Sequence, residues 1–389
     1  MQLNNIPSLI KKTFPVPGRF KGALSSDIAE LSGLLTNTKG DRSLSYLSRP
    51  NFLTAYLYYF LPWNLYRLCL LLPDLTLRLS ADDIITDIGC GPLTFTSALW
   101  IACPPLREIP LEFNCVDRSA QALEAGKKFF NSLCETESGK SRWKINLIKE
   151  DIDFRKTGNF KTSKIKKASL VCAVNLFNEQ YERIPHNNIE GLRKTAEAAA
   201  CLMQRNGTEN ASILTVEPGV PQSGKFISLL RSSLLELNHL PVSPCAHSLS
   251  CPLSPGRKGQ KNRKQWCHFA FDTKDAPPEL HRLSADAGLP KERLVFSYLF
   301  TMPENPKLKN QEKITAENIP NTRIISDVFR LPDNYFGCYG CSDNGLLLLK
   351  TNKNQIKKIK NGNLITSLVN KNNQRDVKSG ALIAGLAEE

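Results

Sequence analysis

The N-terminus carries no recognisable secretory signal, so a disulfide framework is not expected for the twelve cysteines. The sequence also lacks an apolar run suited to a membrane span. The best candidate, Phe52 to Leu72, has Pro62 and Arg67 near its middle. An arginine at the centre of a bilayer costs about 2.5–3.5 kcal/mol, and proline interrupts a helix. We therefore expect two buried helical pieces meeting at Pro62, and no membrane partner.

Several catalytic signatures are missing as well. There is no Asp-Pro-Pro-Tyr motif of amino-methyltransferases, no cysteine pair laid out as in cytosine-5 methyltransferases, and no C-x₃-C-x₂-C motif of radical enzymes. The turn Gly89-Cys-Gly91 lacks a third glycine, with Leu93 in its place, and the dinucleotide motif Gly-x-Gly-x-x-Gly is not satisfied. These absences make radical chemistry and nicotinamide chemistry poor hypotheses for this chain.

Acidic residues are scarce relative to basic ones. The chain has 51 lysines and arginines against 37 aspartates and glutamates, which gives a formal net charge of +14. A balance of this kind favours a polyanionic partner, and RNA is the usual one for such proteins. We expect RNA and no DNA; the alternative is a merely basic surface.

The order of apolar segments predicts an α/β fold. Residues 1–80 have a helical pattern without a glycine-rich turn, and from Asp82 strands and helices alternate. Such alternation is typical of a parallel sheet with helices on both faces. The predicted strands are Ile84–Ile88, Leu111–Val116, Ile145–Ile148, Ala168–Val174, Ala211–Val216, Gln265–Phe271 and Leu294–Thr301.

The predicted organisation has four parts. They are an N-terminal helical region (1–80), a Rossmann-like domain with a seven-stranded sheet (81–303) and a cysteine-bearing insertion (241–267), a small β-rich extension (304–349) and a basic tail (350–389). From Lys350 to Arg375 the tail has seven basic residues and no acidic one, so we expect it to be mobile or bound to RNA.

The turn Asp87-Ile-Gly89-Cys-Gly91 follows the first predicted strand and precedes a helix. Glycine lets the backbone approach a ligand closely, and this turn is of the type that binds S-adenosylmethionine (SAM). Asp87 orders the turn or contacts the methionine amino group. Asp117, at the end of the second strand, suits the ribose hydroxyls, and Asp151, after the third, suits the adenine amine. The alternatives are a related site that no longer binds anything and, less favoured, a dinucleotide site.

The segment Asn175-Leu-Phe-Asn178-Glu179 follows the fourth predicted strand, a position that usually faces the transferred methyl group. Asn178 and Glu179 are the candidate catalytic residues. They would orient a substrate, or they would simply cap a helix, and the sequence leaves both interpretations open.

Cysteines recur in three later patches. Cys245 and Cys251 are followed by Cys267, and then by the pair Cys338 and Cys341. Thiolates are soft ligands that suit zinc or an iron–sulfur cluster, and the spacing is not that of a common zinc finger. His247 and His268 could ligate zinc or bond neighbouring backbone. Scattered surface thiols are the alternative.

A cationic loop lies between the second and third of these cysteines. Five cations and no acid stand in it: Arg257, Lys258, Lys261, Arg263 and Lys264. A metal site would hold this loop at both ends, and its cations would contact RNA phosphates by counterion release. The alternative is a solvated insertion.

Together these motifs resemble a methyltransferase-like family of ribosomal small-subunit assembly proteins, found in mitochondria and bacteria. The resemblance covers residues 6–349, and its most specific part is Pro244–Leu253 followed by Trp266–Phe269. It also rests on Ala55–Pro62, Asp87–Pro92, Leu176–Glu179, Glu217–Gly219 with Gly224, and Arg330 to Leu346. The resemblance implies a SAM-dependent methyltransferase fold, binding to the small ribosomal subunit and its rRNA, and a four-cysteine (4Fe–4S) iron–sulfur cluster.

By this resemblance the cluster ligands are Cys245, Cys251, Cys267 and Cys341, with Cys338 ranked below Cys341. The first hypothesis is therefore a SAM-dependent rRNA methyltransferase with a structural cluster that clamps the β extension. The second is an RNA-binding assembly factor on the same fold that transfers no methyl group, which Leu93 and the lack of an obvious general base favour. A zinc site would change the cofactor only. Because the resemblance begins within ten residues of Met1, we expect the bacterial cytoplasm instead of the mitochondrial matrix.

Overall fold

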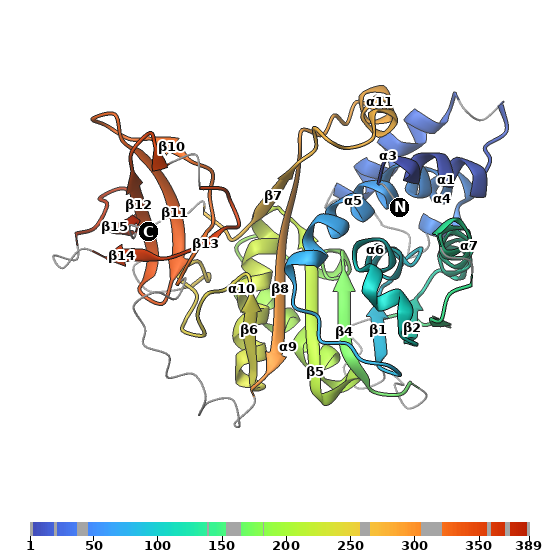
Figure 1. Cartoon of the computed structure of the whole chain (residues 1–389), viewed down its shortest axis with the longest axis horizontal. Coiled ribbons are helices and arrows are strands. Elements are labelled where there is room, and N and C mark those ends of the chain that lie inside the picture. The colour runs from blue at the N-terminus through green and yellow to red at the C-terminus, as the bar shows by residue number, and fades with distance from the viewer. Residues whose placement is uncertain are drawn as a thin grey trace. The chain divides into compact units, whose positions relative to one another are not determined.

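A computed structural model describes residues 3–18, 22–36, 46–137, 140–152, 165–181, 183–256, 265–304, 321–355, 359–369 and 374–386. Two sheets dominate these residues (Figure 1). The larger has the strand order β3-β2-β1-β4-β5-β8-β6, with β7 paired to β8. Two compact units divide the chain: residues 1–176, 205–208 and 271–294 form the first, and residues 177–204, 209–270 and 295–389 the second.

The first unit contains four strands in parallel register. They are β3 (Lys144–Lys149), β2 (Glu112–Asp117), β1 (Ile84–Ile88) and β4 (Ala168–Val174). Each pairs its neighbour without a break, so the carboxyl ends of β1, β2 and β4 reach the same edge. Helices α6 (Thr94–Ala102) and α7 (Ala120–Glu137) follow β1 and β2. The four strands lie where the apolar pattern predicts them, within one residue at most ends.

The N-terminal helices belong to this unit and do not form a separate region. They are α1 (Ile6–Thr13), α3 (Leu24–Thr36), α4 (Pro50–Ala55) and α5 (Leu61–Leu71). Buried side chains such as Ile28, Phe52 and Trp63 share one core with Ala122 of α7 and Leu280 of α11 (Pro278–Asp286). The predicted boundary at residue 80 therefore cuts through a continuous hydrophobic core.

The segment around Pro62 stays helical throughout, which differs from the predicted meeting of two pieces. A π-helical stretch, η3 (Tyr56–Phe60), joins α4 to α5 with helical dihedral angles on both sides. Pro62 has no N–H to donate, and the wider π turn accommodates the missing hydrogen bond. Arg67 is buried and donates to Asn64 at 3.0 Å and Asn175 at 2.9 Å. None of the described helices combines the length and apolarity that crossing a membrane requires.

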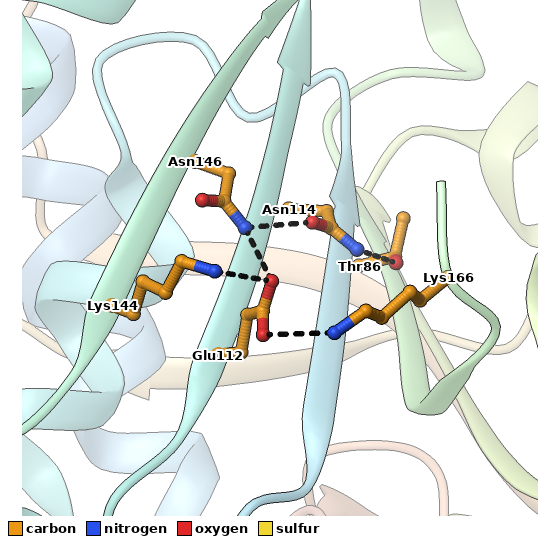
Figure 2. A network of polar contacts seen from close by, with 6 residues as sticks. All are labelled: Thr86, Glu112, Asn114, Lys144, Asn146 and Lys166. Carbon is orange, nitrogen blue, oxygen red and sulfur yellow. Dashed lines mark hydrogen bonds and ion pairs between the residues drawn. The ribbon is translucent and has the colours of Figure 1, made fainter. Parts of the chain in front are cut away.

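A row of polar side chains crosses β1, β2 and β3 in register (Figure 2). Asn114 donates to Thr86 at 3.4 Å, and Asn146 donates to Asn114 at 3.2 Å and to Glu112 at 2.8 Å. Lys144 and Lys166 pair with the Glu112 carboxylate at 3.1 and 3.8 Å. The Asn146 hydrogen bond is the main cause of a lowered pKa at Glu112. Because Glu112 opens β2, this row stabilises the sheet away from the turns at its carboxyl edge.

The second unit holds the remaining strands of the larger sheet. These are β5 (Gly207–Pro218), β6 (His239–Ser243), β8 (Arg293–Pro303) and part of β7 (Phe269–Asp272). β8 runs antiparallel to both β5 and β6, so the sheet is mixed and not fully parallel as predicted. The predicted strand Gln265–Phe271 corresponds to β7, which pairs with β8, whereas the apolar pattern did not predict β6.

A second sheet of seven strands follows residue 320, in the order β13-β9-β11-β12-β15-β14, with β10 paired to β11. Its strands are β9 (Thr322–Ile324), β10 (Phe329–Arg330), β11 (Phe336–Ser342), β12 (Gly345–Thr351), β13 (Leu364–Ile365), β14 (Ser367–Val369) and β15 (Leu382–Leu386). Only Thr366 separates β13 from β14, although they stand at opposite ends of the order. Hydroxyls of Thr322 and Ser367 meet at 2.6 Å, so the sheet curls back on itself.

This arrangement corrects the predicted boundary after residue 349. β12 continues to Thr351, and β15 pairs with it in parallel from Leu382 to Ala384. The described part of the basic segment therefore contributes strands to the sheet. Its apolar positions, such as Ile359 and Leu382, join the core of Leu347 and Leu349. The high content of Lys and Asn concealed these short strands.

Candidate functional site

The turn after β1 is built on two glycines with left-handed backbone, Gly89 at φ +71° and Gly91 at φ +53°. Gly89 donates its N–H to Val116 at 2.8 Å, and Gly91 donates to Asp117 Oδ2 at 2.9 Å. A Cβ on Gly89 would come within 2.6 Å of Leu176. Gly91 instead faces open space, with nothing within 4 Å of such an atom. The turn thus leaves backbone that a ligand can approach closely at Gly91.

Asp87 is fully buried beneath this turn, with Cys115 of β2 and Cys172 of β4 as its partners in register. Cys172 donates its S–H to Oδ1 at 3.5 Å, while Oδ2 has no hydrogen-bond partner among the described residues. Burial raises the Asp87 pKa to about 7, against the lowering effect of the Cys172 hydrogen bond. A buried carboxylate oxygen without a donor is costly, and it fits a place where a ligand supplies one.

The other two predicted SAM contacts follow β2 and β3. Each carboxylate oxygen of Asp117 accepts one backbone N–H, from Gly91 at 2.9 Å and from Ser119 at 2.8 Å. Asp117 therefore positions the turn. Asp151 is exposed just beyond β3. Asp87, Asp117 and the two glycines lie around one turn, whereas Asp151 lies beyond the end of β3.

Asn178 and Glu179 begin the short helix α8 (Asn178–Tyr181) of the second unit. Glu217, at the end of β5, accepts the N–H groups of Phe177 at 2.9 Å and Asn178 at 3.0 Å, and the Tyr181 hydroxyl at 3.0 Å. The Asn178 side chain is buried, and its Oδ1 has no partner in the described residues. Glu217, which positions this segment, was not among the predicted site residues, although the motif Glu217-Pro-Gly219 at the end of β5 marked this position.

Four cysteines from three segments of the second unit are close in space: Cys245, Cys251, Cys267 and Cys341. Burial is the first cause of a raised pKa at each thiol. In every one of the six pairings, one thiol raises the pKa of the other electrostatically. In the described part of the chain, no three His, Cys, Asp or Glu side chains are arranged to hold a single metal ion. The four thiols are therefore neighbours, but among the described residues their arrangement is not that of ligands around a single metal ion.

Two buried arginines hold the loop that carries the first two of these cysteines. Arg231 of α10 (Pro221–Glu236) donates to the carbonyls of His247 at 2.7 Å and Leu249 at 2.8 Å. Arg323 of β9 donates to the carbonyl of Pro244 at 2.6 Å. The positive charge of Arg231 lowers the pKa of all four thiols. This effect of Arg231 on the thiol pKa values opposes the larger effect of burial, which raises them.

Cys338 and Cys341 point in opposite directions because they are three residues apart on β11. Cys338 is fully buried in the core of the second sheet, with Leu347 and Leu349. Cys341 pairs in register with Arg323 of β9 and lies with the other three thiols. The structure thus places Cys341 in the thiol group and Cys338 outside it.

The two candidate histidine ligands differ in their surroundings. His247 Nε2 lies 3.4 Å from Cys341 Sγ, and burial lowers the pKa of this imidazole. His268 instead bonds the Trp266 carbonyl at 3.0 Å and stacks on the Trp266 ring. Trp266 donates to the Gly219 carbonyl at 3.1 Å, which ties the third cysteine segment to the end of β5. His268 therefore contacts a residue of its own loop, and His247 lies next to the thiol of Cys341.

One cavity lies apart from these groups. It has a volume of about 420 Å³ in the first unit and is lined by Ile10 and Lys11 of α1, by Tyr58 and by Leu283 of α11. It does not include any of the predicted site residues. The cationic loop Arg257–Lys264 falls outside the described residues.

The strand order 3-2-1-4-5, continued by an antiparallel strand and an edge strand, is that of the SAM-dependent methyltransferase fold. The sequence profile of a family described as "Mitochondrial small ribosomal subunit Rsm22" matches residues 81–330. No curated protein matches the chain significantly.

Solved structures with a similar fold include a citrinin polyketide synthase CMeT domain, with 14% identity and a TM-score of 0.36 over 72% of this chain and 65% of that one. Another is a fibrillarin/Nop5p complex, with 13% identity and a TM-score of 0.31 over 62% and 83%. A third is precorrin-6y C5,15-methyltransferase from Geobacter metallireducens, with 12% identity and a TM-score of 0.30 over 62% and 86%. Likenesses this remote carry no argument about this chain.

Proposed function

Because this chain belongs to the mitochondrial small ribosomal subunit Rsm22 family, we propose that it is a SAM-dependent methyltransferase of small-subunit rRNA that carries a structural iron–sulfur cluster. The observation that carries the proposal is the coexistence of two groups. One is a glycine turn over a buried carboxylate with an unpaired oxygen, and the other is a set of four mutually close thiols. The turn with its buried carboxylate fits a cationic cofactor, and the four thiols fit a cofactor that is ligated by thiolates.

In the first group, Asp87, Gly89, Gly91, Asp117 and Asp151 would hold SAM, which supplies an electrophilic methyl group. The unpaired Oδ2 of Asp87 would accept the methionine ammonium. Asp117, at the end of β2 beside the turn, would accept the ribose hydroxyls. Gly91 lets the main chain approach the ligand. Asn178, held by Glu217, would orient the substrate through its buried and unpaired carbonyl oxygen, beside Glu179.

We expect Asp117→Ala to weaken SAM binding by well over tenfold, as measured by titration calorimetry on the anaerobically purified protein. The substitution removes charge-assisted hydrogen bonds to ribose, each worth about 1.5–3 kcal/mol, and it frees the Gly91 N–H. Glu112→Gln is the matched control, since this acid begins the same strand and contacts only the polar row. It should keep the affinity of the unchanged protein. Equal affinities for Asp117→Ala and the unchanged protein would remove Asp117 from the site.

In the second group, Cys245, Cys251, Cys267 and Cys341 would ligate the cluster, which supplies a cross-link between distant segments. Four neighbouring thiols suit a four-cysteine cluster, with zinc as the alternative. The buried cation Arg231 favours the anionic charge of a thiolate cluster. The ligands come from the loop before β7 and from β11, so the cluster would fasten the second sheet to that loop.

The partner is proposed to be the rRNA of the small subunit, reached in part by the loop Arg257–Lys264. Neutralising its five cations to glutamine should weaken binding and flatten the plot of log affinity against log salt, by about 0.7–0.9 for each lost phosphate contact. SAM affinity should stay unchanged. The control neutralises five exposed cations of α7 and α9 (Ile189–Asn206): Lys127, Lys128, Arg193, Lys194 and Arg205. Identical salt slopes for the two variants would show that only net charge matters and would exclude recognition by the loop.

A non-catalytic assembly factor on the same fold is the second candidate. Leu93 favours it, because this fully buried residue has φ +55° at the start of α6, in the place of the missing third glycine of the turn. Absence of SAM binding by the cluster-loaded protein, together with intact binding to small-subunit RNA, would decide for this candidate.

A further inference from the structure

Arg231 is a charged residue of the second unit that is buried and only partly hydrogen-bonded. Its side chain is 2% exposed on α10, and a single nitrogen, Nη2, makes both of its hydrogen bonds to carbonyls. The other two nitrogens, Nε and Nη1, have no hydrogen-bond partner among the described residues. A buried guanidinium is always charged, and leaving part of it unpaired costs several kcal/mol. Such a group is expected only where an anion compensates it.

The charges around Arg231 do not supply that anion. Arg323 is a second cation, and it too uses carbonyls as partners, those of Pro244 at 2.6 Å and Gly362 at 2.8 Å. Asp343 acts on His247, and in the described part of the chain neither arginine forms a salt bridge with a carboxylate. Arg231 also acts on His247, and the other groups that face it are the four cysteines, of which Cys245 is close enough to hydrogen-bond its side chain. As neutral thiols these give no compensating charge.

We propose that Arg231 is the charge-compensating positioning residue of the cluster site, with its free Nε and Nη1 directed to the anionic thiolate–cluster unit. This inference rests on the proposed iron–sulfur cluster. It assigns two tasks to one side chain: Nη2 fixes the loop between Cys245 and Cys251 through its carbonyls, and the positive charge stabilises the bound cluster. Charge and hydrogen bonds near the sulfurs are general determinants of cluster retention and reduction potential.

Two substitutions separate these tasks. Arg231→Gln keeps a hydrogen-bond donor without the charge, and Arg231→Lys keeps the charge without the planar fork. We expect Arg231→Gln to shift the reduction potential to a more negative value, because an electron is added to a more negative site. Its cluster should also be lost about 10–100-fold more readily to an iron chelator. Arg231→Lys should keep the potential of the unchanged protein and lose the cluster to an intermediate degree.

The readouts are anaerobic iron and sulfide analysis, optical redox titration and chelator challenge on the full chain. Arg107→Gln is the control, since Arg107 also donates to a carbonyl, that of Trp100 at 2.6 Å, but lies in the first unit. A potential that is equal in Arg231→Gln, Arg231→Lys and the unchanged protein would overturn the inference and leave the cluster itself intact. An unchanged protein that contains no iron and sulfide would instead refute the proposed cofactor.

Discussion

Replacing Cys341 by serine is expected to abolish the iron–sulfur cluster, whereas replacing Cys338 leaves it in place. Both residues lie on β11, but they face opposite sides of the second sheet. Cys341 is coupled electrostatically to the other three thiols, and Cys338 packs against Leu347 and Leu349. Serine is a poor cluster ligand, so losing one thiolate should open the cage and lower stability, because cluster binding is coupled to folding.

The measurement is iron and acid-labile sulfide per chain after anaerobic purification, with the brown absorbance as a second readout. Cys338→Ser is the matched control, because it places the same hydroxyl on the same strand and costs about 1–3 kcal/mol of core stability. The assignment of the fourth ligand is wrong if Cys338→Ser loses the cluster and Cys341→Ser keeps it. Stoichiometric zinc without sulfide in the unchanged protein would point to the zinc alternative.

The sequence predicted the four parallel strands of the first unit well, because each is a short apolar run ended by an acid or a turn. It failed where composition and structure disagree. β6 contains Pro241 and is only five residues long, so its pattern is weak. The strands after Thr351 lie among lysines and asparagines, which are typical of mobile tails, and only their alternating apolar positions marked them.

The candidate site shows a similar limit. Motifs located the glycine turn and the cysteines, but the sequence could not show which side of β11 faces the other thiols. That choice depends on the pairing of β11 with β9 and β12, which is set by distant residues. Arg231 was also out of reach, because its role comes from buried contacts with the carbonyls of a loop. Spacing alone cannot reveal such partners.

The second large effect is expected at Asp87. Its folded-state pKa of about 7 exceeds the ordinary value of 3.8, so the unfolded chain ionises first as the pH rises. Stability contributed by the protonated form is therefore present below about pH 4 and is lost as the pH rises to about 7. A shift of about 3 units at 1.36 kcal/mol each is of the order of 4 kcal/mol. Asp87→Asn cannot ionise, so it should escape this loss.

We expect ligand-free Asp87→Asn to be more stable than the unchanged protein by about 2–4 kcal/mol near pH 7.5, with no gain near pH 4. Denaturant unfolding at several pH values measures the difference. The control is Asp82→Asn, because Asp82 is exposed just before β1 and has a left-handed backbone that asparagine tolerates. Its pH profile should follow that of the unchanged protein. A loss of stability in Asp87→Asn at every pH would show that the ionised carboxylate has a buried partner and would refute the argument.

The same substitution should damage SAM binding while it strengthens the fold. If the methionine ammonium pairs with ionised Asp87, affinity in the unchanged protein should fall about tenfold per pH unit below pH 7 and level off above it. Asp87→Asn should bind SAM weakly and without this pH dependence, as calorimetry across the same pH range would measure. Stability and binding then move in opposite directions, which a general folding defect cannot produce. If SAM binds the asparagine variant as tightly as the unchanged protein, the unpaired oxygen of Asp87 is a cost of the fold and not a cofactor contact.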